Sequence, residues 1–200
     1  MAPALGKLLE ALDKRFETEE LDEFRDLVAV SLNRQQTSLA SVYASLSDAQ
    51  FDDPNDRESY AVHLEDRMVF ANEVQKLADE LAIVALFKKV ELHTKRVAKR
   101  NFPKLDEGQL FNIASLIKVM PFDVEALPNF KSFHELRLLS NAIKHEGKVS
   151  HKLAGAFPSW KVGESLADLG AVYARLNPEV TEYVQAFVAA CYAHSHKFKA

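Results

Sequence analysis

The stretch DRESYAVHLEDRMVFANEVQKLADELAIVALFKKVELHTKRVAKRN, residues 56–101, contains no proline and no glycine over 46 positions. Its apolar residues recur at three- and four-residue steps, which is the spacing of one helix face. Its start is acidic and its end is basic, matching the positive and negative ends of a helix dipole. We therefore predict one long helix over 56–101, capped by Asn55 or Asp56, with a kink or break near Asn72 or His93 left open.

Helical periodicity continues on both sides of this stretch. The other helices that it predicts cover about 3–16, 19–47, 107–119, 129–146, 150–156, 164–176 and 177–196. Asp106 is expected to cap the helix over 107–119, Gly147 to end the helix over 129–146, and Asn177 with Pro178 to open the last one. No segment alternates like a strand. The sequence therefore predicts an all-α fold, a helical bundle built on two long antiparallel helices.

The composition, with 48% hydrophobic residues in 200, is sufficient for one hydrophobic core. We expect one helical domain over 1–200, in which 1–55 holds N-terminal helices that could form an appended hairpin, 56–160 the core, and 161–200 the C-terminal helices. The apolar runs are shorter than the roughly 20 residues of a membrane span, and the start of the chain lacks the apolar block of a signal peptide. The expected location is the cytoplasm, with no membrane association.

The formal net charge of −4 conceals an asymmetry along the chain. Residues 1–66 carry 15 acidic and 6 basic side chains, whereas residues 84–160 carry 13 basic and 7 acidic ones. A basic surface would suit a polyanion such as RNA, because phosphate contacts supply most sequence-independent affinity for nucleic acids. Charge complementarity between the two halves, within the fold or in a dimer, is an equally open explanation.

The segment ELRLLSNAIKHEG, residues 135–147, belongs to the helix predicted over 129–146, which carries an apolar stripe and a polar stripe on opposite sides. The apolar stripe is Phe133, Leu136, Leu139 and Ile143, and the polar stripe is His134, Arg137, Asn141 and His145. A merely solvated face would favour Glu, Lys and Gln, whereas Asn is a mediocre helix former. A reactive face and an ordinary wet face therefore both remain open.

The polar stripe has a coherent joint chemistry. His145 could act as a general acid or base, Asn141 could hold a hydroxyl or phosphate oxygen, and Arg137 offers a planar cationic fork for phosphate. Together they could support RNA transesterification, which needs two proton-transfer groups. His134 lies about 16 Å from His145 along the helix axis, too far to serve as its partner in one chain, but a symmetric dimer could supply a second set. The candidate site residues are three catalytic groups and three substrate contacts: Arg137, Asn141 and His145, then Lys144, Ser140 and His134.

The segment ELRLLSNAIKHEGKVS, residues 135–150, resembles the motif helix of HEPN domains. In that family an arginine, usually followed by a polar residue, precedes a histidine by four to six intervening positions. Asn141 and His145 match, whereas Ser140 stands where the arginine would be, and Arg137 leaves seven residues between. The resemblance implies an all-α nucleotide-binding protein, a metal-independent endoribonuclease of a toxin–antitoxin or phage-defence system, acting as a homodimer on RNA or a nucleotide and held by an antitoxin.

The departure at Ser140 keeps a second hypothesis open, a non-catalytic helical interaction module such as an antitoxin or accessory subunit. No cofactor or metal is expected: His145, Glu146 and His151 could chelate across the glycine turn, but nothing supplies a further ligand set. Trp160 is expected to pack the loop after the motif helix against the bundle.

Overall fold

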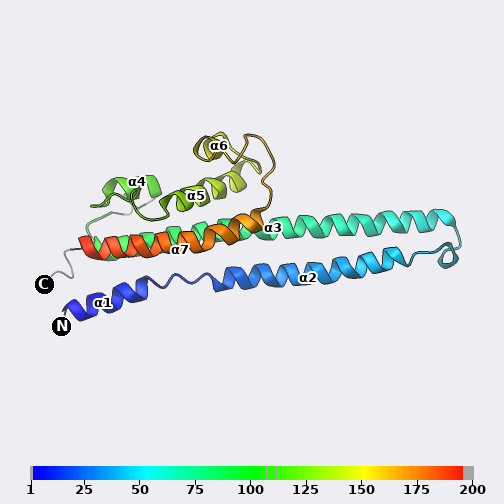
Figure 1. Ribbon diagram of the computed structural model, residues 1–200, viewed down its shortest axis with the longest axis horizontal. Helices are drawn as coiled ribbons and strands as arrows, with labels where there is room; N and C mark the ends of the chain where they lie inside the picture. The colour runs from blue at the N-terminus through cyan, green and yellow to red at the C-terminus, as the bar shows by residue number, and fades with distance from the viewer. Residues whose placement is uncertain (1, 107, 111, 196–200) are drawn as a thin grey trace. The chain divides into compact units, whose positions relative to one another are not determined.

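The computed structural model describes residues 2–106, 108–110 and 112–195. Its elements are α1 (Ala2–Asp13), α2 (Glu19–Ala44), a 3-10 turn (Asp48–Gln50), α3 (Pro54–Asn101), α4 (Ile113–Val119), α5 (Phe130–His145), α6 (His151–Ala156) and α7 (Leu169–His194) (Figure 1). Extended pairing in these residues is limited to one bridge between Lys148 and Ser165. The predicted all-α class is therefore confirmed.

No helix in the described part of the chain combines the length and the apolar character that a bilayer crossing requires. Contacts divide the chain into two compact units, which we call the main unit (residues 1–18 and 83–200) and the hairpin unit (residues 19–82). The helix α3 is continuous and contributes residues to both units. Neither Asn72 nor His93 breaks it.

The hairpin unit consists of α2 and the first part of α3, which run in opposite directions. Arg25 Nε donates to Asp79 at 3.0 Å near one end, and Tyr43 donates to Glu65 at 2.8 Å near the other. None of the residues of α2 is buried, and the unit carries 15 acidic and 5 basic side chains. The two amphipathic helices of this unit are therefore held together by polar contacts more than by a closed hydrophobic core.

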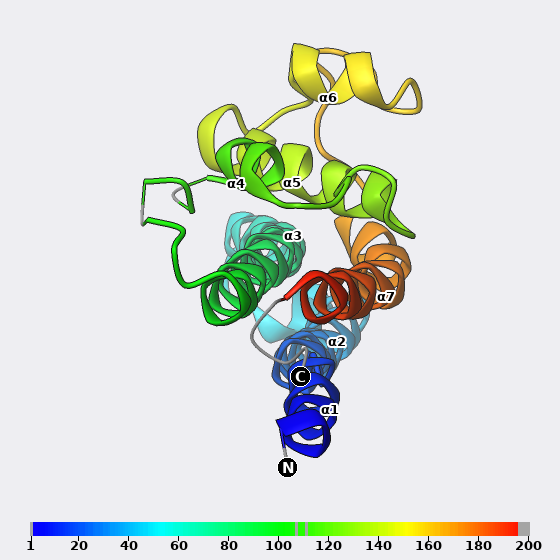
Figure 2. The ribbon, with the colours of Figure 1, turned by 90° about the vertical axis from the view of Figure 1, so that its left-hand side faces the viewer.

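The main unit is built around the last part of α3 and the helix α7, which lie side by side in Figure 2. The helices α4, α5 and α6 lie on one side of this pair, and α1 lies on the other. Its core is formed by fully buried aliphatic side chains of α3, α5 and α7: Ile83, Leu86, Val90, Leu136, Leu139, Leu176, Val180, Val184 and Val188. Burial of these side chains is the main stabilising contribution to the unit.

An aromatic stack joins α5 to α7. The rings of Phe133 and Tyr183 lie parallel, with centroids 4.5 Å apart and an interplanar angle of 5°. Phe130 and Phe187 also contact the Tyr183 ring, with centroids 6.2 Å and 6.3 Å away. Burial raises the pKa of the Tyr183 phenol, since the ionised form would lose its hydration. The stack therefore holds α5 by packing, with the phenol un-ionised.

The helix α7 corrects a sequence prediction, because residues 164–176 and 177–196 do not form two helices. α7 runs unbroken through Pro178, and Asn177 donates to Thr18 at 3.0 Å instead of serving as a cap. Position 196 lies outside the described residues. A proline inside a helix removes one backbone hydrogen bond, but buried side chains on both sides of Pro178 face one core. The free energy gained by burying side chains along the whole of α7 is larger than the free energy lost with one backbone hydrogen bond.

Two predicted helix starts are also wrong in detail. α4 begins six residues after the predicted start at 107, because Asn112, not Asp106, accepts the capping N–H of Ser115 at 2.9 Å. Asp106 instead accepts the N–H of Gln109 in a separate turn. Positions 107 and 111 lie outside the described residues. At α3, the helix begins at Pro54, and Asp53 accepts the N–H of Asn55 at 2.8 Å, so neither predicted cap is used.

A buried carboxylate fixes the end of α1 to the other helices of the main unit. Asp13 accepts two hydrogen bonds of 2.7 Å from Arg100 and one of 2.8 Å from Tyr192. The carbonyl oxygen of Asp13 lies 2.7 Å from His93 Nε2. Burial lowers the pKa of His93 below its ordinary value, although the hydrogen bond to Asp13 opposes this shift. His93 is therefore neutral in the folded protein at neutral pH.

Pro178→Ala is expected to stabilise the main unit by about 1–2 kcal/mol, because the new N–H can bond to the carbonyl of the preceding turn. Urea unfolding followed by the fluorescence of Trp160 measures the change. Gln185→Ala, at an exposed position of the same helix, is the control and should change little. A lower stability for Pro178→Ala would indicate that residue 178 begins a separate helix.

His93→Gln is expected to reduce the loss of stability at mildly acidic pH. The unfolded chain binds a proton at His93 near pH ~6.5, while folded His93 stays neutral to a lower pH. The stability that neutral, folded His93 contributes is fully present above about pH 6.5. It is lost as the pH falls toward the pKa of His93 in the folded protein. Urea midpoints between about pH 5 and 7, referred to those at about pH 8, measure the effect. An identical acid loss in wild type and variant would contradict it.

Candidate functional site

The helix α5 ends as the sequence predicts, at a left-handed glycine. Gly147 has φ of 63°, and the N–H groups of Glu146 and Gly147 both donate to the carbonyl of Ala142 at 3.0 Å. This arrangement closes the last turn and reverses the chain direction. The residue before the helix, Asn129, is also left-handed and donates its side-chain amide to Glu182 at 2.6 Å.

Seven of the 16 residues of α5 are buried, and they extend beyond the one stripe that the sequence predicts. The predicted stripe residues Phe133, Leu136 and Leu139 are buried, but Leu138 and Ser140 are buried as well. The reason is that α6 and the segment after it cover a second side of the helix. Ser140, predicted as a substrate contact, is fully buried, so its side chain is not accessible from solvent in this structure.

Two of the predicted catalytic residues lie together in a cleft between α5 and α6. This α5–α6 cleft has a volume of about 370 Å³ and is lined by Leu138, Asn141, Ala142, His145, Glu146, Ser150, His151 and Lys152. Asn141 is half-buried, and the side chains of His145, His151 and Lys152 are exposed. The cleft therefore combines two accessible imidazoles, one amide and one ammonium group over an apolar floor.

The wall of the cleft formed by α6 is held by backbone and cap hydrogen bonds. Ser150 accepts the N–H of Leu153 at 3.1 Å, which caps α6. Val149 and the segment 163–164 exchange two backbone hydrogen bonds of 2.9 Å. These contacts fix the turn between the two helices. The positions of His145 and His151 on either side of this turn are therefore fixed as well.

Arg137 and His134 line a different groove, between α5 and α4. This groove has a volume of about 220 Å³, and its other lining residues are Ile113, Ala114, Ile117, Lys118, Glu125, Phe130 and Phe133. Burial lowers the pKa of both Arg137 and His134, and the Arg137 charge adds to the shift of His134. The structure thus separates the predicted arginine from the predicted amide and imidazole. Arg137 lies two helical turns before His145, so it lies beside α4, whereas His145 lies beside α6.

Lys144 is placed beside the hydrophobic face of α3. Its Nζ atom lies 5.5 Å from the centre of the Phe87 ring, within range of a cation–π contact. The side chain is exposed, yet it does not line the α5–α6 cleft. As a substrate contact it would have to leave the Phe87 ring.

The buried carboxylate of Glu135 fixes the loop that follows α6. Glu135 Oε1 accepts hydrogen bonds from Trp160 Nε1 at 3.0 Å and from Arg175 Nη2 at 2.8 Å. These bonds tie α5, the loop and α7 to one oxygen. The prediction that Trp160 packs the loop against the bundle is confirmed.

Sequence reasoning missed the roles of His151 and Lys152 in the cleft. The sequence suggests His151 only as a metal ligand, together with His145 and Glu146. The available signal was the turn itself, because a helix ending at Gly147 and another beginning at 151 must place their adjoining ends close together. Within the described residues, no group of three or more His, Cys, Asp or Glu side chains is arranged to hold a metal ion.

Comparison of the chain with protein-family models, with curated proteins and with solved structures finds no match.

Glu135→Ala is expected to release the loop, because Trp160 and Arg175 lose their shared acceptor. The expected destabilisation is about 1–3 kcal/mol, with a red shift of the emission of Trp160, the single tryptophan. Fluorescence spectra and urea unfolding measure both. Glu179→Ala removes a longer, 3.7 Å contact to Arg175 and is the matched control. An unchanged emission maximum in Glu135→Ala would show that the loop is held by other contacts.

Proposed function

We propose that this chain is a HEPN-like RNA- or nucleotide-binding protein of the cytoplasm that cleaves RNA as a metal-independent endoribonuclease. One observation carries the proposal: His145, His151, Asn141 and Lys152 line a single cleft at the end of α5. The proposed setting is a toxin–antitoxin or phage-defence system, in which the chain acts as a homodimer and binds an antitoxin partner. The resemblance of residues 135–150 to the HEPN motif helix supports this setting.

The two imidazoles supply the two proton-transfer groups that the reaction needs. In the proposed step one imidazole removes the proton of a ribose 2′-hydroxyl while O2′ forms a bond to the adjacent phosphorus. The other imidazole, protonated, donates a proton to O5′ while the P–O5′ bond breaks. The products are a 2′,3′-cyclic phosphate and a 5′-hydroxyl, so atoms and charge balance without a further reactant.

The remaining cleft residues have matching roles in this proposal. Lys152 contributes the positive charge that attracts the phosphate, a role that Arg137 cannot fill from the neighbouring groove. Asn141 is half-buried and can hold a hydroxyl or phosphate oxygen. Glu146 is the one carboxylate of the lining.

A second candidate function is that of a non-catalytic protein-interaction module, an antitoxin or accessory subunit. The observation that favours it is a set of exposed apolar side chains on the hairpin unit: Phe24, Leu27, Val30, Val62, Val69, Phe70, Leu77 and Leu81. Such a surface is typical of a contact with another protein. The net charge of −10 on residues 19–82 selects a partner with a basic surface.

Replacement of either cleft histidine, His145→Ala or His151→Ala, is expected to lower the rate of RNA cleavage by about 10²–10⁴-fold, because each removes one proton-transfer group. Purified protein is incubated with RNA in the presence of a chelator, and the products are tested for 2′,3′-cyclic phosphate ends. His63→Ala, an exposed histidine of the hairpin unit, is the matched control and should cleave like the wild type.

Expression in a bacterial host separates the two candidate functions. Growth arrest with RNA breakdown that His145→Ala abolishes supports the nuclease. A harmless wild type with intact cellular RNA, together with no cleavage in vitro, would overturn it and favour the interaction module.

A further inference from the structure

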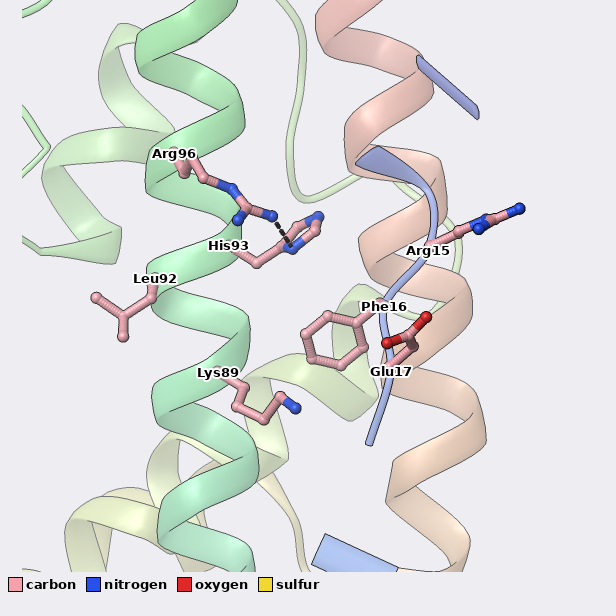
Figure 3. Close-up of a pocket in the computed structure, with 7 residues that line it drawn as sticks. All are labelled: Arg15, Phe16, Glu17, Lys89, Leu92, His93 and Arg96. Carbon is pink, nitrogen blue, oxygen red and sulfur yellow. Dashed lines mark hydrogen bonds between the residues drawn. The ribbon is translucent and has the colours of Figure 1, made fainter. Parts of the chain in front are cut away.

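A second pocket of the main unit lies between α3 and the extended segment that follows α1. Its volume is about 370 Å³, and it is lined by Arg15, Phe16, Glu17, Lys89, Leu92, His93 and Arg96 (Figure 3). Lys89, His93 and Arg96 are spaced by four and three residues, so one face of α3 presents all three to the pocket. None of these residues belongs to the α5–α6 cleft.

The wall of this pocket is fixed by His93. Arg96 Nη2 lies 3.0 Å from His93 Nδ1, and because a guanidinium only donates, Nδ1 accepts and Nε2 donates to the carbonyl of Asp13. The Phe16 ring meets the His93 ring edge-on, with centroids 5.5 Å apart. Buried Asp13 is itself fixed by Arg100 and Tyr192. The pocket is therefore preorganised on its α1 side.

The charges of the pocket are predominantly positive. Arg15, Lys89 and Arg96 are cations, and Glu17 is the one carboxylate of the lining. Arg96 has no carboxylate partner among the described residues, and it donates instead to the neutral ring of His93. Figure 3 shows Lys89 extending toward the side of Phe16 and Glu17, whereas Arg15 points away from the other labelled side chains. Arg96 therefore keeps unused donors and an uncompensated charge at the pocket.

We propose that this pocket binds a small organic phosphate, with Arg96 as the principal phosphate contact. A planar guanidinium with several remaining N–H groups suits phosphate oxygens, and the Lys89 ammonium adds charge from the same helix face. Phe16 and Leu92 give the pocket an apolar side that an inorganic ion would leave unused. The volume lies within the range of small-molecule sites, which favours a ligand with an organic part.

The proposal is tested on the full chain with three probes: phenyl phosphate, inorganic phosphate and phenol. Amide chemical shifts of residues 15–17 and 89–96 are followed during each titration. Phenyl phosphate is expected to bind more tightly than either of the other two, because it alone uses both the cationic and the apolar parts of the pocket.

Two substitutions are expected to act in opposite directions. Arg96→Gln should weaken phenyl phosphate binding about tenfold or more, since a charge-assisted hydrogen bond is lost. Glu17→Gln should strengthen binding about two- to threefold, because it removes the repelling carboxylate. Arg67→Gln, an exposed arginine of α3 outside the pocket, is the matched control and should bind like the wild type. Far-UV circular dichroism checks that each variant is folded.

Several results would overturn the assignment. Equal weakening by Arg67→Gln and Arg96→Gln would reduce the binding to general charge attraction. Phenol binding as tightly as phenyl phosphate would leave only an apolar cavity. Phosphate-induced shifts confined to residues 141–152 would place phosphate binding in the α5–α6 cleft instead. The site does not depend on the proposed nuclease function, so loss of RNA cleavage in His145→Ala leaves this test unaffected.

Discussion

The parallel stack of Phe133 on Tyr183 is the contact on which the arrangement of the main unit depends. Both rings are almost completely buried, and their centroids are 4.5 Å apart. Two large aromatic side chains bury more apolar area than any aliphatic pair, so this contact sets where α5 lies along α7. The candidate residues Asn141 and His145 follow on the same rigid helix. The position of the α5–α6 cleft therefore depends on a packing contact two to three turns away.

Two buried carboxylates also fix the position of parts of the main unit. Asp13 binds Arg100 and Tyr192, and Glu135 binds Arg175 and Trp160. Each carboxylate accepts hydrogen bonds from residues in separate parts of the chain. These bonds are needed because an unpaired buried charge would lower the stability of the fold. Asp13 fixes the α1 side of the pocket lined by Lys89 and Arg96, and Glu135 fixes the loop that follows α6.

Much of the candidate site could be predicted from the motif helix alone. Helical periodicity placed Asn141 and His145 on one side of α5, and the glycine at 147 ended the helix where expected. The burial of Ser140 could not be predicted, because periodicity identifies one buried stripe and cannot indicate that a second element will cover another side. The angular pattern alone groups Arg137 with His145, but each groove extends over only part of the helix, so the two residues line different grooves.

By itself, the sequence determined the helical class and most element boundaries, because helix formation follows local spacing of apolar residues and local turn chemistry. Tertiary structure decided the continuity of α7 through Pro178, since burial along the whole helix outweighs one missing backbone hydrogen bond. It also decided that His151 and Lys152 join His145 in one cleft, and that Phe16 meets His93 across 77 positions of sequence. Local patterns carry no information about which elements cover one another; that is set by the packing of the whole unit.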